Sequence, residues 1–219
     1  MSIGFFLLIA AGLLVLFGAG QRVLDRLRLT DRQALLFIAL IIAGGFLPDI
    51  SLSPSFAFNL GGALIPLALC VYLWIKAGSV LERVRSLLAS LMSAIAVFLL
   101  GRYLPENPES MVIDPTLAYG LAAGVIAWLF GRSRRGAFIA GTLGVMLAQT
   151  VSWLNARALG ADTRLVLGGA GAYDAVVIAG LLAVLLCELI GEIVERARRG
   201  KRRPSREFRG GEFVGKERP

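Results

Sequence analysis

Apolar residues gather into long runs along this chain, separated by charged or turn-forming segments. A helix that crosses a bilayer needs about 20 largely apolar residues. Seven runs approach that length: Ile3–Gly20, Ala34–Leu47, Phe56–Ile75, Ser86–Leu104, Leu117–Phe130, Ala137–Leu154 and Ala172–Ile193. The second and fifth runs have only 14 residues, which leaves open whether they cross fully. The pattern predicts an all-α fold, a seven-helix transmembrane bundle over residues 1–194. We expect a disordered basic tail over residues 195–219.

The positions of the charges predict which way the helices cross. Of the 23 Lys and Arg residues, 20 lie in alternate segments between the runs or in the tail. Cytoplasmic loops of membrane proteins carry such an excess of positive charge. We therefore expect an N-terminus outside the cell, a C-terminus in the cytoplasm and a multi-pass protein of the plasma membrane. A cleaved signal peptide is disfavoured because no Lys or Arg precedes Arg22.

Composition supports the membrane assignment and excludes several classes of protein. Hydrophobic residues make up 57% of the 219 residues, and the mean hydropathy is +0.74. These values exclude a soluble enzyme, a disordered chain and a disulfide scaffold. The chain contains no His, and Cys70 and Cys187 sit singly inside apolar runs. We therefore expect no metal and no cofactor, and we interpret both cysteines as small core residues.

The net charge of +8 is explained by topology signals, so we expect no nucleic-acid partner. Ten basic residues follow Glu195, close to the last apolar run. Such a cluster is attracted to anionic lipids, although a tail that only fixes topology is the alternative. Small residues at helical spacing, such as Gly120 and Gly124, indicate a tightly packed monomeric bundle or a homodimer seam. We favour the monomer, and the oligomeric state stays open.

Three acidic residues fall inside the last apolar run: Asp174, Glu188 and Glu192. We expect Glu188 and Glu192 to pair with Arg196, Arg199 or arginines of the loops. Asp174 lies near the outer end of the run, behind the glycine-rich segment 168–171. It is either an N-terminal cap of the helix or a site residue facing the interior of the bundle, because charged groups inside membranes are usually functional.

Further polar residues gather on the same predicted outer side. Asn59 and Gln149 lie within runs, and Asp114 lies in an outer loop. Gly61 and Gly62 follow Asn59, and Pro66 comes next, so this run is expected to be broken and to free backbone carbonyls. The pattern predicts an outward-facing pocket, lined by Asp174, Asn59, Gln149 and Asp114, that binds or moves a small polar solute or a cation.

Three segments carry a resemblance to a known family: Asn59-Leu-Gly-Gly-Ala-Leu-Ile-Pro66, Gly141-Thr-Leu-Gly144 and Gly168-Gly-Ala-Gly-Ala-Tyr-Asp174. They resemble a family of bacterial and archaeal membrane proteins filed as domain of unknown function 1614, from about the second run to the seventh. The resemblance implies a polytopic membrane protein and no particular activity. The chain departs from the family pattern where an Asp follows the glycines of the sixth run, because Gln149 or Thr150 stands there.

Tyr173-Asp174 and the preceding glycines are also loosely similar to the motifs of intramembrane aspartyl proteases. Such enzymes need two carboxylates that share one proton. The sixth run offers no second Asp, and Asp114 is the nearest candidate partner. We therefore favour a non-enzymatic protein with a polar pocket. An aspartyl protease that uses Asp174 with Asp114, and a membrane scaffold without any site, are the alternatives.

Overall fold

The computed structural model describes residues 30–103, 115–131, 133–171, 174–201, 206–209 and 212–215. The first predicted run, Ile3–Gly20, and the candidate residue Asp114 lie outside these residues. The chain divides into two units, residues 1–188 and residues 189–219, and each is described by itself.

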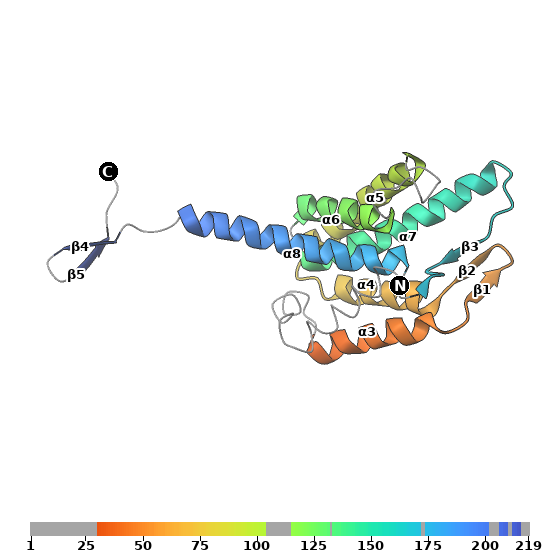
Figure 1. Ribbon diagram of the computed structural model, residues 1–219, viewed down its shortest axis with the longest axis horizontal. Helices are drawn as coiled ribbons and strands as arrows, with labels where there is room; N and C mark the ends of the chain where they lie inside the picture. The colour runs from red at the N-terminus through yellow and green to blue at the C-terminus, as the bar shows by residue number, and fades with distance from the viewer. Residues whose placement is uncertain are drawn as a thin grey trace. The chain divides into compact units, whose positions relative to one another are not determined.

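The described part of the first unit is built mainly from helices (Figure 1). They are α3 (Asp31–Gly45), the π-helical turn η1 (Leu60–Leu64), α4 (Ile65–Ile75), α5 (Val80–Tyr103), α6 (Pro115–Gly131), α7 (Arg134–Ala158) and the first part of α8 (Ala175–Lys201). Three helices among the described residues are long and apolar enough to cross a membrane: α5, α7 and the Ala175–Ala197 part of α8. The prediction of a mostly helical membrane protein is therefore confirmed. The count of seven spans and their direction stay predictions.

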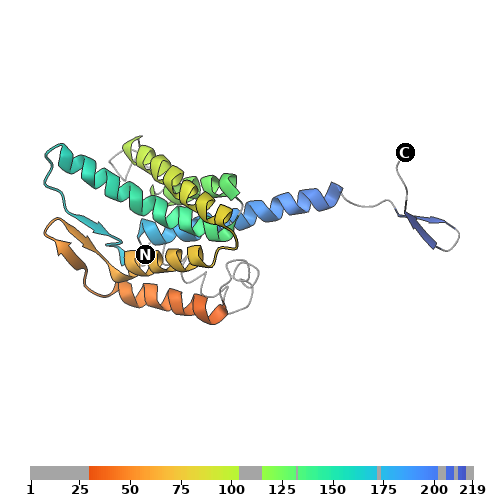
Figure 2. The ribbon, with the colours of Figure 1, turned by 180° about the vertical axis from the view of Figure 1, so that it is seen from behind.

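A small sheet, which the apolar pattern did not predict, lies beside these helices (Figure 2). It contains β1 (Ile50–Ser53), β2 (Phe56–Phe58) and β3 (Leu165–Leu167). Strand β2 is antiparallel to β1 and parallel to β3. The expectation of an all-α fold with a helix from Phe56 is therefore wrong, because these apolar residues pair with neighbouring strands. The break expected after Asn59 is present as η1, where the chain turns into α4.

Side-chain caps set where several helices begin. Thr30 and Gln33 form a capping box at the start of α3. The Ser79 and Ser133 hydroxyls accept backbone N–H groups at the starts of α5 and α7. Because a cap satisfies N–H groups that have no partner within the helix, these three helices begin three to six residues before the apolar runs that predicted them.

Small residues bring the helices close together inside the first unit. Because Gly120 and Gly124 of α6 have no side chain, Leu182, Leu186 and the backbone of α8 lie directly against them. Gly144 of α7 lies against Ser93 of α5. These contacts confirm that the small-residue spacing serves packing within the chain.

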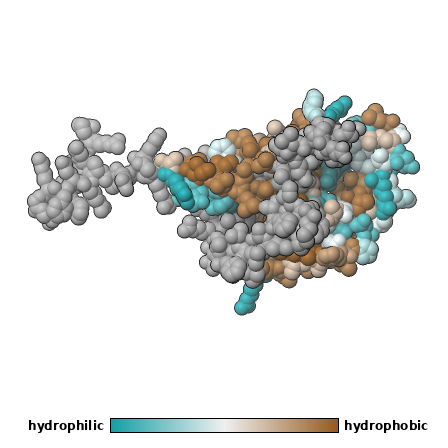
Figure 3. All heavy atoms as spheres, in the orientation of Figure 1, coloured by the Kyte–Doolittle hydropathy of each residue, from teal (hydrophilic) through white to brown (hydrophobic). Residues whose placement is uncertain are grey.

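The surface of the described helices is largely apolar. Figure 3 shows hydrophobic residues over much of the described surface on the face in view. Helix α5 alone exposes Leu87, Leu88, Leu91, Ile95 and Leu99. Such a surface on long apolar helices fits contact with the lipid bilayer.

The described residues of the second unit comprise the end of α8 and a two-stranded antiparallel hairpin, β4 (Arg206–Arg209) and β5 (Glu212–Gly215). Glu192 and Arg196 form an ion pair of 2.7 Å one turn apart, as predicted. Helix α8 continues to Lys201, so the predicted tail from Glu195 begins inside a helix.

Gly62 and Gly168 allow a close backbone approach that positions the sheet and the helices. A Cβ atom added to Gly62 would lie 2.1 Å from the carbonyl oxygen of Gly168. Gly168 itself has a φ of +69°, a backbone conformation that residues with a side chain rarely adopt. The contact joins the start of η1 to the segment that follows β3, so both segments depend on glycine at these positions.

We expect Gly62→Ala to prevent correct folding, because its methyl group would collide with backbone that cannot move aside. The cost should exceed about 3 kcal/mol, the upper end of ordinary overpacking. Fluorescence-detected size-exclusion chromatography and thermal unfolding in detergent measure the effect. Gly136→Ala is the control, because its added methyl group would meet only ordinary contacts from 3.6 Å. Equal behaviour of the two variants would contradict the proposed role of the close approach.

Candidate functional site

Asn59 joins β2 to η1 and is only 3% exposed. Its Oδ1 accepts hydrogen bonds from the N–H groups of Gly61 and Gly62, at 2.9 and 3.0 Å. Its Nδ2 donates to Asp49 Oδ1 at 3.0 Å and to the carbonyl oxygen of Leu47 at 3.3 Å. The side chain therefore caps the π-helical turn and ties it to the end of α3, and these contacts use all of its polar atoms.

Asp174 occupies the matching position before α8 and is 9% exposed. Its run was expected to be helical from Ala172, whereas α8 begins at Ala175, so Asp174 precedes the helix. One carboxylate oxygen accepts the N–H of Val176 at 3.0 Å, and the other accepts the N–H of Ala170 at 3.4 Å. Burial raises the pKa of Asp174 above its usual value, and hydrogen bonds from Val176, Ala170 and Gln149 partly oppose that rise.

The two caps lie in equivalent settings because β2 and β3 are parallel. Phe58 is paired with Leu167, and the N–H of Asn59 donates to the carbonyl oxygen of Leu167 at 2.9 Å. Each strand is thus followed by a polar cap and a helical element, Asn59 before η1 and Asp174 before α8, with glycines close to the cap. The predicted gathering of polar residues reflects this pair of strand–cap–helix units.

Gln149 of α7 connects Asp174 to a cavity. Its side chain hydrogen-bonds Asp174, while its buried Oε1 has no hydrogen-bond partner among the described residues. The cavity, of about 340 Å³, lies among α5, α6, α7 and β3. Its polar lining residues are Tyr119, Gln149, Ser152, Trp153, Thr163 and Arg164.

The predicted site residues are therefore only partly brought together. The structure places Asp174 beside Gln149, and Gln149 beside the cavity. Asn59 is not among the cavity's described lining residues, and Asp114 lies outside the described residues. Arg164, which the sequence pattern did not predict as a site residue, lines the cavity and donates to the Ser51 hydroxyl at 3.1 Å.

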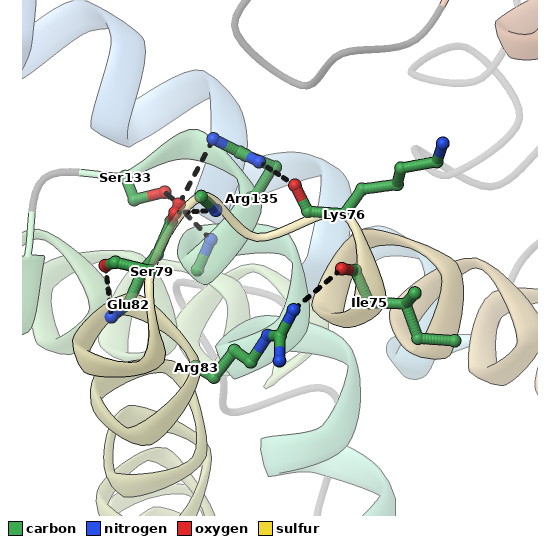
Figure 4. Close-up of polar contacts among 9 residues, drawn as sticks. Ile75, Lys76, Ser79, Glu82, Arg83, Ser133 and Arg135 are labelled. Carbon is green, nitrogen blue, oxygen red and sulfur yellow. Dashed lines mark hydrogen bonds and ion pairs between the residues drawn. The ribbon is translucent and has the colours of Figure 1, made fainter.

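A second polar cluster, at the junction of α4, α5 and α7, was not predicted (Figure 4). Glu82 accepts the N–H of Gly78 at 2.9 Å and the Ser133 hydroxyl at 2.7 Å. It also forms an ion pair of 3.4 Å with Arg135. The Glu82 carboxylate therefore joins the starts of α5 and α7.

Arginines of the same cluster cap the end of α4. Arg83 donates to the carbonyl oxygen of Ile75 at 3.1 Å, and Arg135 donates to that of Lys76 (Figure 4). Cations are favoured there because the last carbonyls of a helix lack partners within it and carry partial negative charge. Nearby in sequence, Arg134 pairs with Glu188 at 2.6 Å, which confirms the predicted pairing of Glu188 with a loop arginine.

Comparison with known families agrees with the resemblance seen in the glycine-rich segments. The profile of a family described as protein of unknown function (DUF1614) matches residues 26–186. The chain belongs to the DUF1614 family. No curated protein and no solved structure matches it. The matched region covers both strands, both caps, the start of α8 and every residue of the cavity lining, so these features lie within the part that the family shares.

We expect Asp174→Asn to keep the fold and Asp174→Ala to lose about 1 kcal/mol of stability, as capping residues typically do. The raised pKa of Asp174 predicts a pH effect with a definite sign. In the folded protein the Asp174 carboxyl stays protonated above its ordinary pKa of 3.8, whereas in the unfolded chain it ionises near that value. The free energy of unfolding should therefore fall as the pH rises above 3.8 and the carboxyl is forced to ionise in the folded state.

Thermal unfolding in detergent from pH 4 to pH 8 tests this expectation. The wild type should lose stability relative to Asp174→Asn as the pH rises. A difference between the two proteins that stays constant, or that changes in the wild type's favour, would contradict the effect of burial.

We also expect Glu82→Ala to destabilise the protein by about 2 kcal/mol, because it leaves partly buried donors of Ser133 and Arg135 without their acceptor. Glu192→Ala is the matched control, since the exposed Glu192–Arg196 pair should contribute less than about 1 kcal/mol. Chemical unfolding of both variants in a mild detergent measures the difference. Similar losses would show that the Glu82 cluster does not hold the helix junction.

Proposed function

We propose that this DUF1614 protein is a multi-pass protein of the plasma membrane that binds a small polar solute in the cavity beside Gln149. The observation that carries the proposal is Gln149, which lines a 340 Å³ cavity and whose buried Oε1 has no hydrogen-bond partner among the described residues. A buried acceptor without a donor is costly, so such groups often mark a place where a ligand or water donates. Small-molecule sites begin at about this volume.

The lining favours a solute with both a hydrogen-bond donor and a negative group. Gln149 offers an acceptor, and Arg164 offers a positive charge. None of the described lining residues is a carboxylate, so the cavity suits a zwitterion, such as a free amino acid, better than a metal cation. Asp174 would act indirectly, by positioning Gln149.

The same contacts favour a binding protein over an aspartyl protease. The hydrogen-bond partners of Asp174 in the described structure are two backbone N–H groups and Gln149, and an amide cannot share a proton as a second carboxylate does. A membrane scaffold without any site predicts a filled core, whereas this protein has a cavity of about 340 Å³ beside Gln149. Solute binding therefore accounts for more of the site than either alternative.

For the topology, we propose the N-out, C-in arrangement that the charges predict. Arg135 contacts both the Lys76 carbonyl oxygen and Glu82, so two basic segments meet at one end of the first unit. Arg164 and the caps Asn59 and Asp174 belong instead to the region of the sheet β1–β2–β3. For the tail we propose contact with anionic lipids of the inner leaflet, through its basic residues.

We expect glycine, serine or glutamate to raise the thermal stability of the purified protein in detergent, whereas glycerol and sodium chloride should not. A ligand present at 100 times its Kd stabilises the folded state by about 2.7 kcal/mol. Gln149→Leu should abolish the shift because it removes the buried acceptor. Arg164→Gln should weaken binding of every amino acid that shifts the wild type.

Thr150→Val is the matched control for Gln149→Leu. Thr150 is the next residue of α7, but its hydroxyl bonds the Met146 carbonyl, and Thr150 is not among the cavity's described lining residues. This variant should bind as the wild type does. A shift that survives Gln149→Leu would remove the cavity from the proposal, and the absence of a shift with every amino acid tested would remove the proposed ligand class.

A further inference from the structure

A second cavity, of about 220 Å³, lies among α5, α6 and α7 near the Glu82 cluster. Its walls come from the first turns of α5 and α7 and from the last turns of α6. The residues that line it are Ser79, Leu81, Glu82, Arg85, Ser86, Ala89, Ala127, Phe130, Ser133 and Gly136. It shares no described lining residue with the cavity beside Gln149.

The lining of this cavity is amphipathic. Leu81, Ala89 and Phe130 supply an apolar wall, whereas Ser79, Arg85 and Ser133 supply hydroxyls and a positive charge. A soluble polar molecule would leave the apolar wall uncovered, and a purely apolar one would leave the guanidinium group of Arg85 without a counter-charge. The lining therefore suits a molecule with a charged head and a hydrocarbon chain.

The charges around the cavity select the sign of that head. Both oxygens of Glu82 are engaged, by Gly78, Ser133 and Arg135, so this acid is already neutralised. Arg85 is exposed and makes no hydrogen bond or ion pair with the described residues. Arg83, which donates to the carbonyl oxygen of Ile75 in the first turns of the same helix, adds a further positive charge (Figure 4). The local excess of positive charge attracts an anion.

We propose that this cavity binds an anionic phospholipid, with the phosphate at Arg85 and an acyl chain against Leu81, Ala89 and Phe130. Basic pockets between membrane helices bind lipid headgroups in this way. The Ser79 hydroxyl lies within the same lining, and because it only accepts a hydrogen bond, from the Glu82 N–H, it can donate its own proton to a phosphate or glycerol oxygen. This site is separate from the basic tail, and it does not rest on solute binding at Gln149.

Native mass spectrometry of the full chain in a neutral detergent tests the proposal. The probes are phosphatidylglycerol and phosphatidylcholine with identical acyl chains, and inorganic phosphate. The wild type should retain phosphatidylglycerol well above phosphatidylcholine. Arg85→Gln should lower retention of phosphatidylglycerol about fivefold, the factor expected from one basic contact at a membrane surface.

Arg102→Gln is the matched control, because Arg102 is an exposed arginine at the other end of the same helix. It should retain phosphatidylglycerol as the wild type does. Equal loss in the two variants would show a general charge effect and overturn the site. Equal retention of the two lipids by the wild type, or displacement of phosphatidylglycerol by millimolar inorganic phosphate, would overturn the assignment to a lipid.

Discussion

The contact between Gly62 and Gly168 is the constraint on which the arrangement of the candidate site depends. It brings the backbone after β3 against the first turn of η1, where no side chain fits between them. This close approach allows the backbone N–H of Asn59 to donate to the carbonyl oxygen of Leu167, and it allows β2 and β3 to pair in parallel. The π-helical turn η1 and helix α8 then begin at polar caps, Asn59 and Asp174. Irregular backbone is tolerated in a membrane protein where its polar groups find partners within the protein, and the two caps provide those partners.

The sequence predicts most helices well because their apolar runs are long and are interrupted by charges. It fails at Phe56–Phe58 because three apolar residues within a longer apolar run look the same whether they form a helix or a strand. These residues form a strand because they pair with β1, which is close in sequence, and with β3, which is far away in sequence. The glycines after Asn59 and Leu167 did signal close approach, but a sequence does not show which segments approach one another.

The candidate site illustrates the same limit. Asp174 is conspicuous in the sequence because a carboxylate in an apolar run is rare. The structure explains its place in large part by capping, since both of its oxygens accept backbone N–H groups. Gln149 is less conspicuous, yet it is the residue with a buried unpartnered atom at a cavity. The role of Glu82 was not predicted, because its partners Ser133 and Arg135 belong to a segment about 50 residues away, and the sequence does not show that the two segments are in contact.

Membership of a family without an assigned activity leaves function to be argued from particular groups rather than from the fold. The side chain of α7 that lies beside Asp174 is the amide of Gln149. An amide can hydrogen-bond Asp174, but it is not the second ionisable group that proton-sharing chemistry needs. Gln149 also lines the cavity, and its buried Oε1 has no hydrogen-bond partner among the described residues. This arrangement is suited to recognition of a hydrogen-bond donor, which is why we propose binding, rather than acid–base catalysis, as the chemistry of the site.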